Sequence, residues 1–141
     1  MAAGLLLLVL AGDARAILYQ GTQPIKPDFR AAAEYLQERY HPGDAIIFHL
    51  AYLAQNFDYY YAGDFSGQGA PAAANGSPGP DFDSQMRTNT EGHDTVWLVL
   101  SEAEMWDPQG LVKAWLDDHA VTPPEERSFT LVSVYGYRLD R

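Results

Sequence analysis

The chain has 141 residues without cysteine, and 19 acidic against 9 basic side chains give it a formal net charge of −10. That length suits one domain and is too short for a multi-span membrane protein, while a hydrophobic fraction of 47% is ordinary for a globular core. The acidic balance argues against nucleic acid as a partner, because phosphate binding needs a basic face, and the lack of cysteine excludes disulfides and thiolate metal sites.

The N-terminal segment differs from the rest of the chain. Residues 1–12 form an apolar run without a charge before Asp13, which is shorter than the roughly 20 residues of a membrane-spanning helix. We interpret residues 1–18 as the end of a membrane helix or as a secretory signal cleaved after Ala16, although no basic residue precedes the apolar run. A buried core helix is the weaker alternative. Both leading interpretations predict a membrane-associated or exported chain whose soluble part is extracytoplasmic.

Residues 19–141 are expected to form a single domain. Its first part, 19–27, contains glycine and prolines and predicts an extended connector. Asp28 then stands at an N-cap position before a predicted helix over 29–40, in which apolar residues recur at helical spacing. The continuous apolar run 45–50 predicts a strand covered on both faces, and a second helix is predicted over 52–61.

The second half of the chain contains a long segment, 64–94, with almost no periodicity, and we predict a surface loop there. A second buried strand is predicted over 95–100. Asp107 is expected to cap a third helix with Pro108 at its first position, and 128–139 is predicted to be one terminal strand. This alternation indicates a small three-layer α/β domain, with a parallel or mixed sheet flanked by helices.

Two polar side chains follow the predicted strands. His49 ends the first strand and Glu102 follows the second, where ligands collect in open α/β sheets. His49 is a candidate base or ligand contact, although a half-buried structural histidine is the favoured alternative because a lone histidine is unspecific. Glu102 lies with Glu104 and Asp107 in a candidate cation or sugar-hydroxyl site, for which helix-dipole compensation and solvated carboxylates are the favoured alternative.

The segment 52–61 carries an unusual set of aromatic side chains, namely Tyr52, Phe57, Tyr59, Tyr60 and Tyr61. Tyrosine rings on one surface could stack on sugars or contact lipid headgroups, because tyrosine is amphipathic. The alternative is that Tyr52, Phe57 and Tyr60 pack the helix on the sheet while Tyr59 and Tyr61 line its edge. Packing is favoured for Phe57, and Tyr52, Tyr59 and Tyr60 are kept as candidate substrate-binding residues.

No cofactor, metal site or catalytic residue is indicated. The pattern Gly67-x-Gly69-x-x-Ala72 matches a dinucleotide-binding fingerprint in form, but it follows no predicted strand and opens no predicted helix. The four histidines lack the spacing of zinc ligands.

Several segments together carry a resemblance to a known family. They are the apolar N-terminal run, Asp28-Phe29-Arg30 opening a helix that ends Tyr35-Leu36, Pro42-Gly43-Asp44-Ala45-Ile46, Phe57-x-Tyr59-Tyr60, Val96-Trp97-Leu98-Val99, and Val112-x-x-Trp115-Leu116. In this combination the chain resembles the C-terminal extracytoplasmic domain of bacterial polytopic membrane glycosyltransferases, the protein-mannosyltransferase-like group that uses polyprenyl-phosphate sugars. The match extends over nearly the whole chain from Leu5 to Leu139.

The resemblance implies a small α/β domain that follows the last membrane helix. The family's catalytic acidic residue lies in an early extracytoplasmic loop that has no counterpart here, so no catalytic residue is carried over. The chain would then be a fragment with an accessory role, which covers the membrane-embedded site or contacts a lipid-linked sugar or acceptor. A secreted carbohydrate- or solute-binding module is the alternative, and a small soluble enzyme acting through His49 and Glu102 is a third hypothesis.

Overall fold

The computed structural model describes residues 26–71, 73–74 and 77–140. Along the chain lie α2 (Phe29–Gln37), β1 (Ala45–Phe48), α3 (Leu53–Asp58), β2 (Gly67–Gly69), β3 (Ala73–Ala74), β4 (Ser77–Pro78), α4 (Phe82–Thr90), β5 (Thr95–Ser101), α5 (Ala103–Trp106), α6 (Leu111–His119), β6 (Glu125–Phe129) and β7 (Val132–Arg138). Within these ranges no helix is long and apolar enough to cross a bilayer. The N-terminal segment 1–18, for which the sequence predicts a membrane helix end or a signal, lies outside the described residues.

A five-stranded mixed sheet forms the centre of the domain, with strand order β2-β1-β5-β7-β6. Strand β1 runs parallel to both of its neighbours, β2 and β5. Strand β7 runs antiparallel to β5 and β6. The predicted small α/β fold with a parallel or mixed sheet is therefore confirmed, and the sheet is of the mixed kind.

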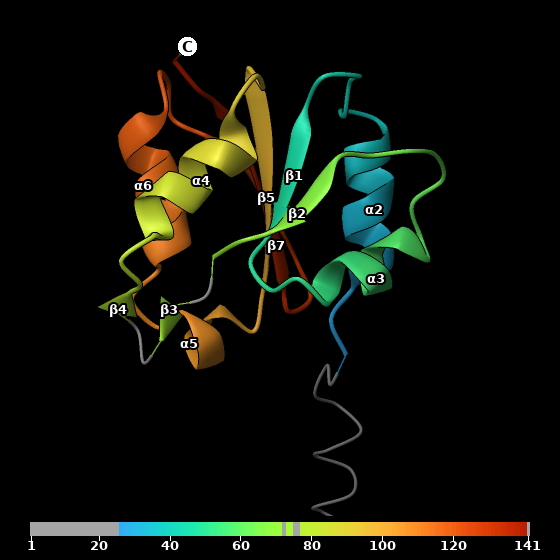
Figure 1. Cartoon of the computed structure of the whole chain (residues 1–141). Helices are drawn as coiled ribbons and strands as arrows, with labels where there is room; N and C mark the ends of the chain where they lie inside the picture. Colours follow the sequence, from blue (N-terminus) through green and yellow to red (C-terminus); the bar gives the residue numbers. More distant parts are fainter. Residues whose placement is uncertain (1–25, 72, 75–76, 141) are drawn as a thin grey trace, which may run out of the picture.

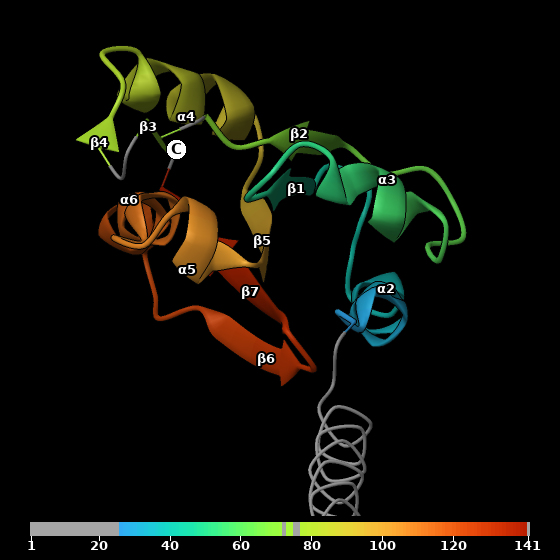
Figure 2. The same cartoon turned by 90° about the horizontal axis from the view of Figure 1, so that it is seen from below.

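Helices cover both faces of this sheet (Figures 1 and 2). Helices α2 and α3 pack on one face, against side chains that include Ile46, Phe48 and Val99. Helices α4 and α6 pack on the other face, where Ile47 and Leu98 belong to a second cluster. Because neighbouring residues of a strand point to opposite faces, continuous apolar runs such as β1 fill both cores at once.

The first half of the chain follows the predicted elements closely. The Asp28 carboxylate accepts a hydrogen bond from the Ala31 backbone N–H at 3.0 Å, and so caps α2 as expected. Helix α2 buries Phe29, Ala32, Ala33 and Leu36. Strand β1 is buried along its whole length, as is expected of a strand between two helical layers.

The prediction of a surface loop over 64–94 is wrong, because β2, β3, β4 and α4 all lie there. Helix α4 buries Phe82, Met86 and Thr90, which recur every fourth residue, so its apolar stripe is one residue wide and gives a weak sequence signal. Strand β2 has the sequence Gly-Gln-Gly and pairs with β1 through its backbone. Such a strand has no apolar pattern that sequence analysis could detect.

Two further expectations need correction. The predicted terminal strand 128–139 is a hairpin, in which β6 is an exposed edge strand and β7 is largely buried. Helix α6 begins at Leu111 and not at Pro108, because residues 107–110 form a turn in which the Gly110 N–H donates to the Asp107 carbonyl at 2.9 Å. Asp107 still caps the helix, since its carboxylate accepts from the Leu111 and Val112 N–H groups at 2.9 and 3.1 Å.

The indole ring of Trp97 in the central strand β5 occupies the space in which the side chain of its partner on β7 would lie, so that partner is a glycine. Its indole N–H donates to the Asp44 carboxylate at 3.0 Å, and its ring lies edge-on to Tyr35, with centroids 6.3 Å apart. On the adjacent strand Gly136 is its register partner. A Cβ atom at Gly136 would come within 2.5 Å of the indole ring, which leaves no room for any other residue.

We expect Gly136→Ala to lower the free energy of unfolding by about 1–3 kcal/mol, the usual cost of overpacking a core. The indole cannot move aside without losing its hydrogen bond to Asp44. Urea unfolding followed by circular dichroism measures the change. Gly79→Ala is the control, because a Cβ there meets nothing within 4 Å. Equal free energies of unfolding for the two variants would show that Trp97 leaves room for a Cβ atom at position 136.

Candidate functional site

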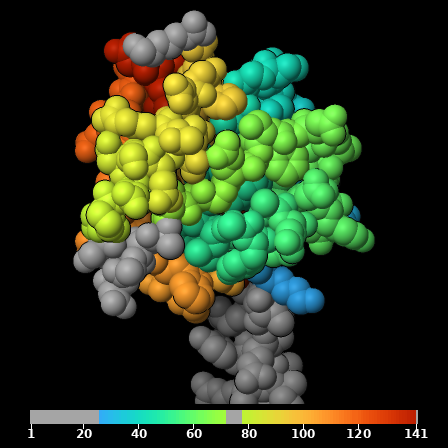
Figure 3. Space-filling model, in the orientation of Figure 1, coloured from blue at the N-terminus to red at the C-terminus, as the bar shows by residue number. Residues whose placement is uncertain are grey.

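The carboxyl ends of the parallel strands and the start of the described chain lie at one end of the molecule. His49 follows β1 and Glu102 follows β5, and both strands end in the same direction because they are parallel. In Figure 3 the residues around α5 (orange) and the first described residues (blue) both lie at the lower end of the face shown. This is the end at which ligands are expected in an open α/β sheet.

A cavity of about 510 Å³ opens there between α3, the first described residues and the end of β5. It is lined by Lys26, Pro27, Phe29, Tyr52, Leu53, Gln55, Asn56, Tyr59, Tyr60 and Glu102. Four of the five predicted site residues, Tyr52, Tyr59, Tyr60 and Glu102, therefore border one space. The prediction did not include Lys26, Gln55 or Asn56, whose residue types are common on any surface.

Tyr52 and Glu102 join the two sides of this cavity. The Tyr52 hydroxyl donates to the Glu102 carboxylate at 2.7 Å. This hydrogen bond to a carboxylate raises the pKa of Tyr52 above its usual value. Glu102 itself has left-handed backbone angles, φ 58° and ψ 25°. A residue other than glycine adopts them at a cost, and such residues cluster at functional sites.

Tyr59 and Tyr60 form the aromatic wall of the cavity. Tyr59 is 82% exposed, and its ring stands perpendicular to that of Tyr60, with centroids 4.9 Å apart. The guanidinium of Arg30 lies over the Tyr60 ring, 5.4 Å from its centroid. The alternative that Tyr52 and Tyr60 pack the helix on the sheet is wrong, since both are exposed, whereas Phe57 is fully buried as expected.

His49 is not among the residues that line this cavity. Its side chain is buried, and Nδ1 has no hydrogen-bond partner within the described part of the chain. Burial lowers the pKa of His49, and the Asp107 carboxylate and the backbone of Ser101 oppose this only in part. His49 and Glu102 are therefore not presented to one ligand in this cavity, which weakens the hypothesis of an enzyme that uses both.

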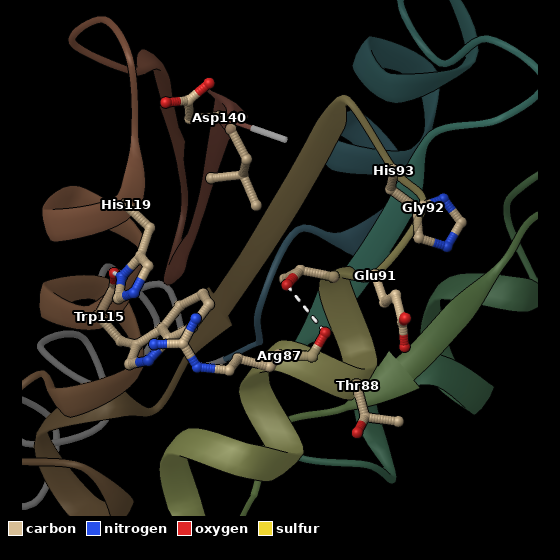
Figure 4. A pocket seen from close by; sticks show the side chains of 10 residues that line it. Arg87, Thr88, Glu91, Gly92, His93, Trp115, His119 and Asp140 are labelled. Atoms are coloured by element: carbon tan, nitrogen blue, oxygen red, sulfur yellow. Dashed lines mark hydrogen bonds between the residues drawn. The ribbon is translucent and has the colours of Figure 1, made fainter.

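A second cavity, of about 650 Å³, lies at the opposite end of the sheet, where β5 begins and β7 ends. Figure 4 shows Arg87, Trp115 and His119 on one side of it and Glu91 and His93 on the other. The rings of Trp115 and His119 stack, with centroids 3.8 Å apart, and His119 Nδ1 lies 2.7 Å from the Trp115 carbonyl oxygen. None of the predicted site residues lines this cavity.

Among the described residues no group of three or more histidine, aspartate or glutamate side chains could hold a metal ion.

Comparisons of the chain with known proteins identified no relative. No family model, curated protein or solved structure matches the chain. The resemblance to membrane glycosyltransferase domains therefore stays a prediction from the sequence.

Replacing a residue by glycine usually destabilises a protein more than replacing it by alanine. At Glu102 we expect the opposite order, because its backbone is left-handed. Glu102→Gly and Glu102→Ala both remove the carboxylate, but only glycine adopts φ 58° without strain. The glycine variant should have the higher free energy of unfolding, by about 1 kcal/mol. Chemical denaturation of the two variants measures the difference. A more stable alanine variant would show that the backbone at this position carries no strain.

The burial of His49 predicts a pH-dependent stability. Its folded-state pKa lies below the unfolded value of 6.5, so the unfolded chain binds more protons between these two values. The contribution of His49 to the free energy of unfolding should therefore fall as the pH drops below 6.5 and level off below its folded-state pKa. In His49→Gln this slope should disappear. Asp83 and Glu125, whose pKa values are also lowered, reduce the stability further only in the carboxylate range. Chemical denaturation at a series of pH values from 7 downward measures the slope in both proteins. The same slope in both would show that His49 does not cause the pH dependence.

Proposed function

We propose that this chain is an accessory, extracytoplasmic sugar-binding domain of a membrane-attached glycosyltransferase system, and that the cavity beside Tyr59 and Glu102 takes the glycosyl headgroup of a lipid-linked sugar. The observation that carries the proposal is the convergence of Tyr52, Tyr59, Tyr60 and Glu102 on one cavity. These side chains come from two segments about 50 residues apart in the sequence, and the sequence resemblance implies the same class of ligand.

The aromatic wall and the carboxylate suit a sugar. Exposed aromatic rings offer flat apolar surface to the C–H face of a pyranose ring. The Glu102 carboxylate can accept hydrogen bonds from sugar hydroxyls through the oxygen that Tyr52 does not engage. The amides of Gln55 and Asn56 supply both donors and acceptors on the same wall. A cavity of about 510 Å³ is also in the size range of small-ligand sites.

Two cationic side chains favour a sugar that carries a phosphate. Lys26 lines the cavity, and the Arg30 guanidinium lies above the Tyr60 ring at its wall. The chain as a whole has a net charge of −10, so two cations beside one cavity are unusual in it. An anionic group bound there could form charge-assisted hydrogen bonds with both. A polyprenyl-phosphate sugar presents a pyranose ring and a phosphate side by side.

The lining of the cavity supports binding more than catalysis. Glycosyl chemistry commonly uses two carboxyl groups on opposite sides of the bond that reacts, and Glu102 is the one carboxylate among the residues that line this space. The domain would therefore hold a donor or acceptor, while the transfer takes place elsewhere in the system.

Binding of short-chain prenyl-phosphate hexoses to the full chain tests the proposal. Calorimetric titration with mannose, glucose and galactose derivatives should identify at least one ligand. Glu102→Gln should weaken it about ten-fold or more, because a hydrogen bond to a charged group is lost. Tyr59→Ala should weaken it about three-fold or more through the loss of ring contact.

Glu104→Gln is the matched control, since this carboxylate is two residues away and does not line the cavity. Absence of binding across the panel, or equal affinity of Glu102→Gln and the unchanged chain, would contradict the proposal. The alternative of a secreted carbohydrate-binding module would use the same cavity but predicts cleavage after Ala16. The intact mass of the exported protein distinguishes the two.

A further inference from the structure

Exposed apolar side chains gather at the end of the molecule that carries the proposed sugar site. Met105 and Trp106 of α5 are 71% and 51% exposed, and Tyr59 of α3 and Leu131 of the β6–β7 turn are exposed as well. Of the large apolar side chains that the structure describes as exposed, Val121 alone lies elsewhere, beside Arg138 at the opposite end of the sheet. We call the surface of Tyr59, Met105, Trp106 and Leu131 the apolar end.

Contacts within the structure bring the segments of the apolar end together. Pro27 and Glu102 border both the sugar cavity and a neighbouring cavity of about 470 Å³, which Leu131 also lines. The Asp28 N–H donates to the Thr130 carbonyl at 2.9 Å, and so ties the β6–β7 turn to the first described residues. The β6–β7 turn that carries Leu131 and the cavity that Tyr59 lines therefore both adjoin the first described residues.

Helix α5 has no part in the hydrophobic core. It contains four residues, none of which is buried or belongs to either core cluster, and its two largest apolar side chains are exposed. Leaving Met105 and Trp106 in water forgoes the free energy that burial of their apolar surface would contribute. Exposed apolar side chains that gather at one end of a domain mark a contact with a protein or a membrane.

The chain that precedes the domain indicates which of these contacts applies. Residues 5–10 are apolar without exception, and the sequence predicts that residues 1–18 enter a bilayer or a translocation path. Only the seven residues 19–25 separate this segment from Lys26, and the eight steps along the chain reach about 27 Å when fully extended. An N-terminal segment inserted in a bilayer would therefore hold the apolar end closest to the lipid.

We propose that the apolar end docks onto a lipid bilayer at the headgroup level, with Trp106, Met105, Tyr59 and Leu131 as its contacts. Tryptophan and tyrosine prefer this interfacial region, because their rings are apolar and carry one polar group. The inference rests on the proposed function insofar as it assumes membrane attachment. In this orientation the cavity of Tyr52 and Glu102 opens at the level where the headgroups of lipid-linked sugars lie.

The negative charge of the domain predicts that it prefers a bilayer without net charge to an anionic one. Glu102 and Glu104 flank the apolar end, and the chain carries a net charge of −10. Lys26 and Arg30 at the sugar cavity attract a single anionic group locally, but the net negative charge of the chain repels an anionic surface as a whole. Docking should therefore be stronger on phosphatidylcholine than on bilayers that also contain phosphatidylglycerol, and added salt should reduce the difference by screening.

The lack of cysteine makes a site-specific test simple. In the full chain reconstituted in phosphatidylcholine vesicles, Met105→Cys labelled with the environment-sensitive fluorophore NBD should show a blue shift and a rise in emission of about two-fold or more, because lipid excludes water from the label. Val121→Cys is the matched control, as Val121 is an apolar side chain that is 49% exposed at the opposite end. Spin-labelled lipids should quench the first label and spare the second.

Three results would overturn the inference. The first is the same emission from both labels in vesicles. The second is a blue shift of the Met105→Cys label that depends on protein concentration in the absence of vesicles, since a second copy of the chain would then cover the apolar end. The third is emission from the Met105→Cys label that is unchanged when Trp106 and Leu131 are both replaced by serine. Binding of prenyl-phosphate hexoses by that double variant tests the proposed function separately, because neither residue lines the sugar cavity.

Discussion

The contact between Trp97 and Gly136 is the constraint on which the rest of the domain depends. It sets how closely β7 approaches β5, and the indole hydrogen bond to Asp44 ties the turn before β1 to the same point. Tyr35 meets the indole edge-on and so connects α2 to the sheet. With these elements held together, the carboxyl ends of β1 and β5 emerge from a rigid base, which allows side chains there to have functions other than packing.

Sequence analysis predicted the parts of the fold in which apolar side chains determine the structure. The capped helix after Asp28 and the apolar strands β1 and β5 each have a clear pattern that a buried element requires. The elements that it missed depend on backbone pairing or on very few apolar contacts. Strand β2 consists of Gly67, Gln68 and Gly69 and is held by β1 through hydrogen bonds, and α4 presents a single narrow stripe.

The candidate site was predictable only where its residues follow a clear sequence pattern. Glu102 could be placed because it follows an unmistakable strand, and the tyrosines because their density is unusual. The sequence did not show which of them would be exposed, since helical spacing suits packing as well as a binding surface. It also did not show that His49 would be buried and would not line the cavity, because one residue's difference in where a strand ends changes the direction of its side chain. Lys26 could not be singled out, because only the folded structure brings it to the cavity that α3 also lines.

The two edges of the sheet would have a further consequence on the proposed bilayer surface. Strand β6 is an exposed edge with Glu125, Glu126 and Arg127 in succession, and β2 at the other edge is only three residues long. Charged or very short edge strands resist pairing with the strands of another molecule. Copies of the domain crowded onto that proposed surface would therefore not pair through their sheet edges, and the sheet would not become a template for aggregation.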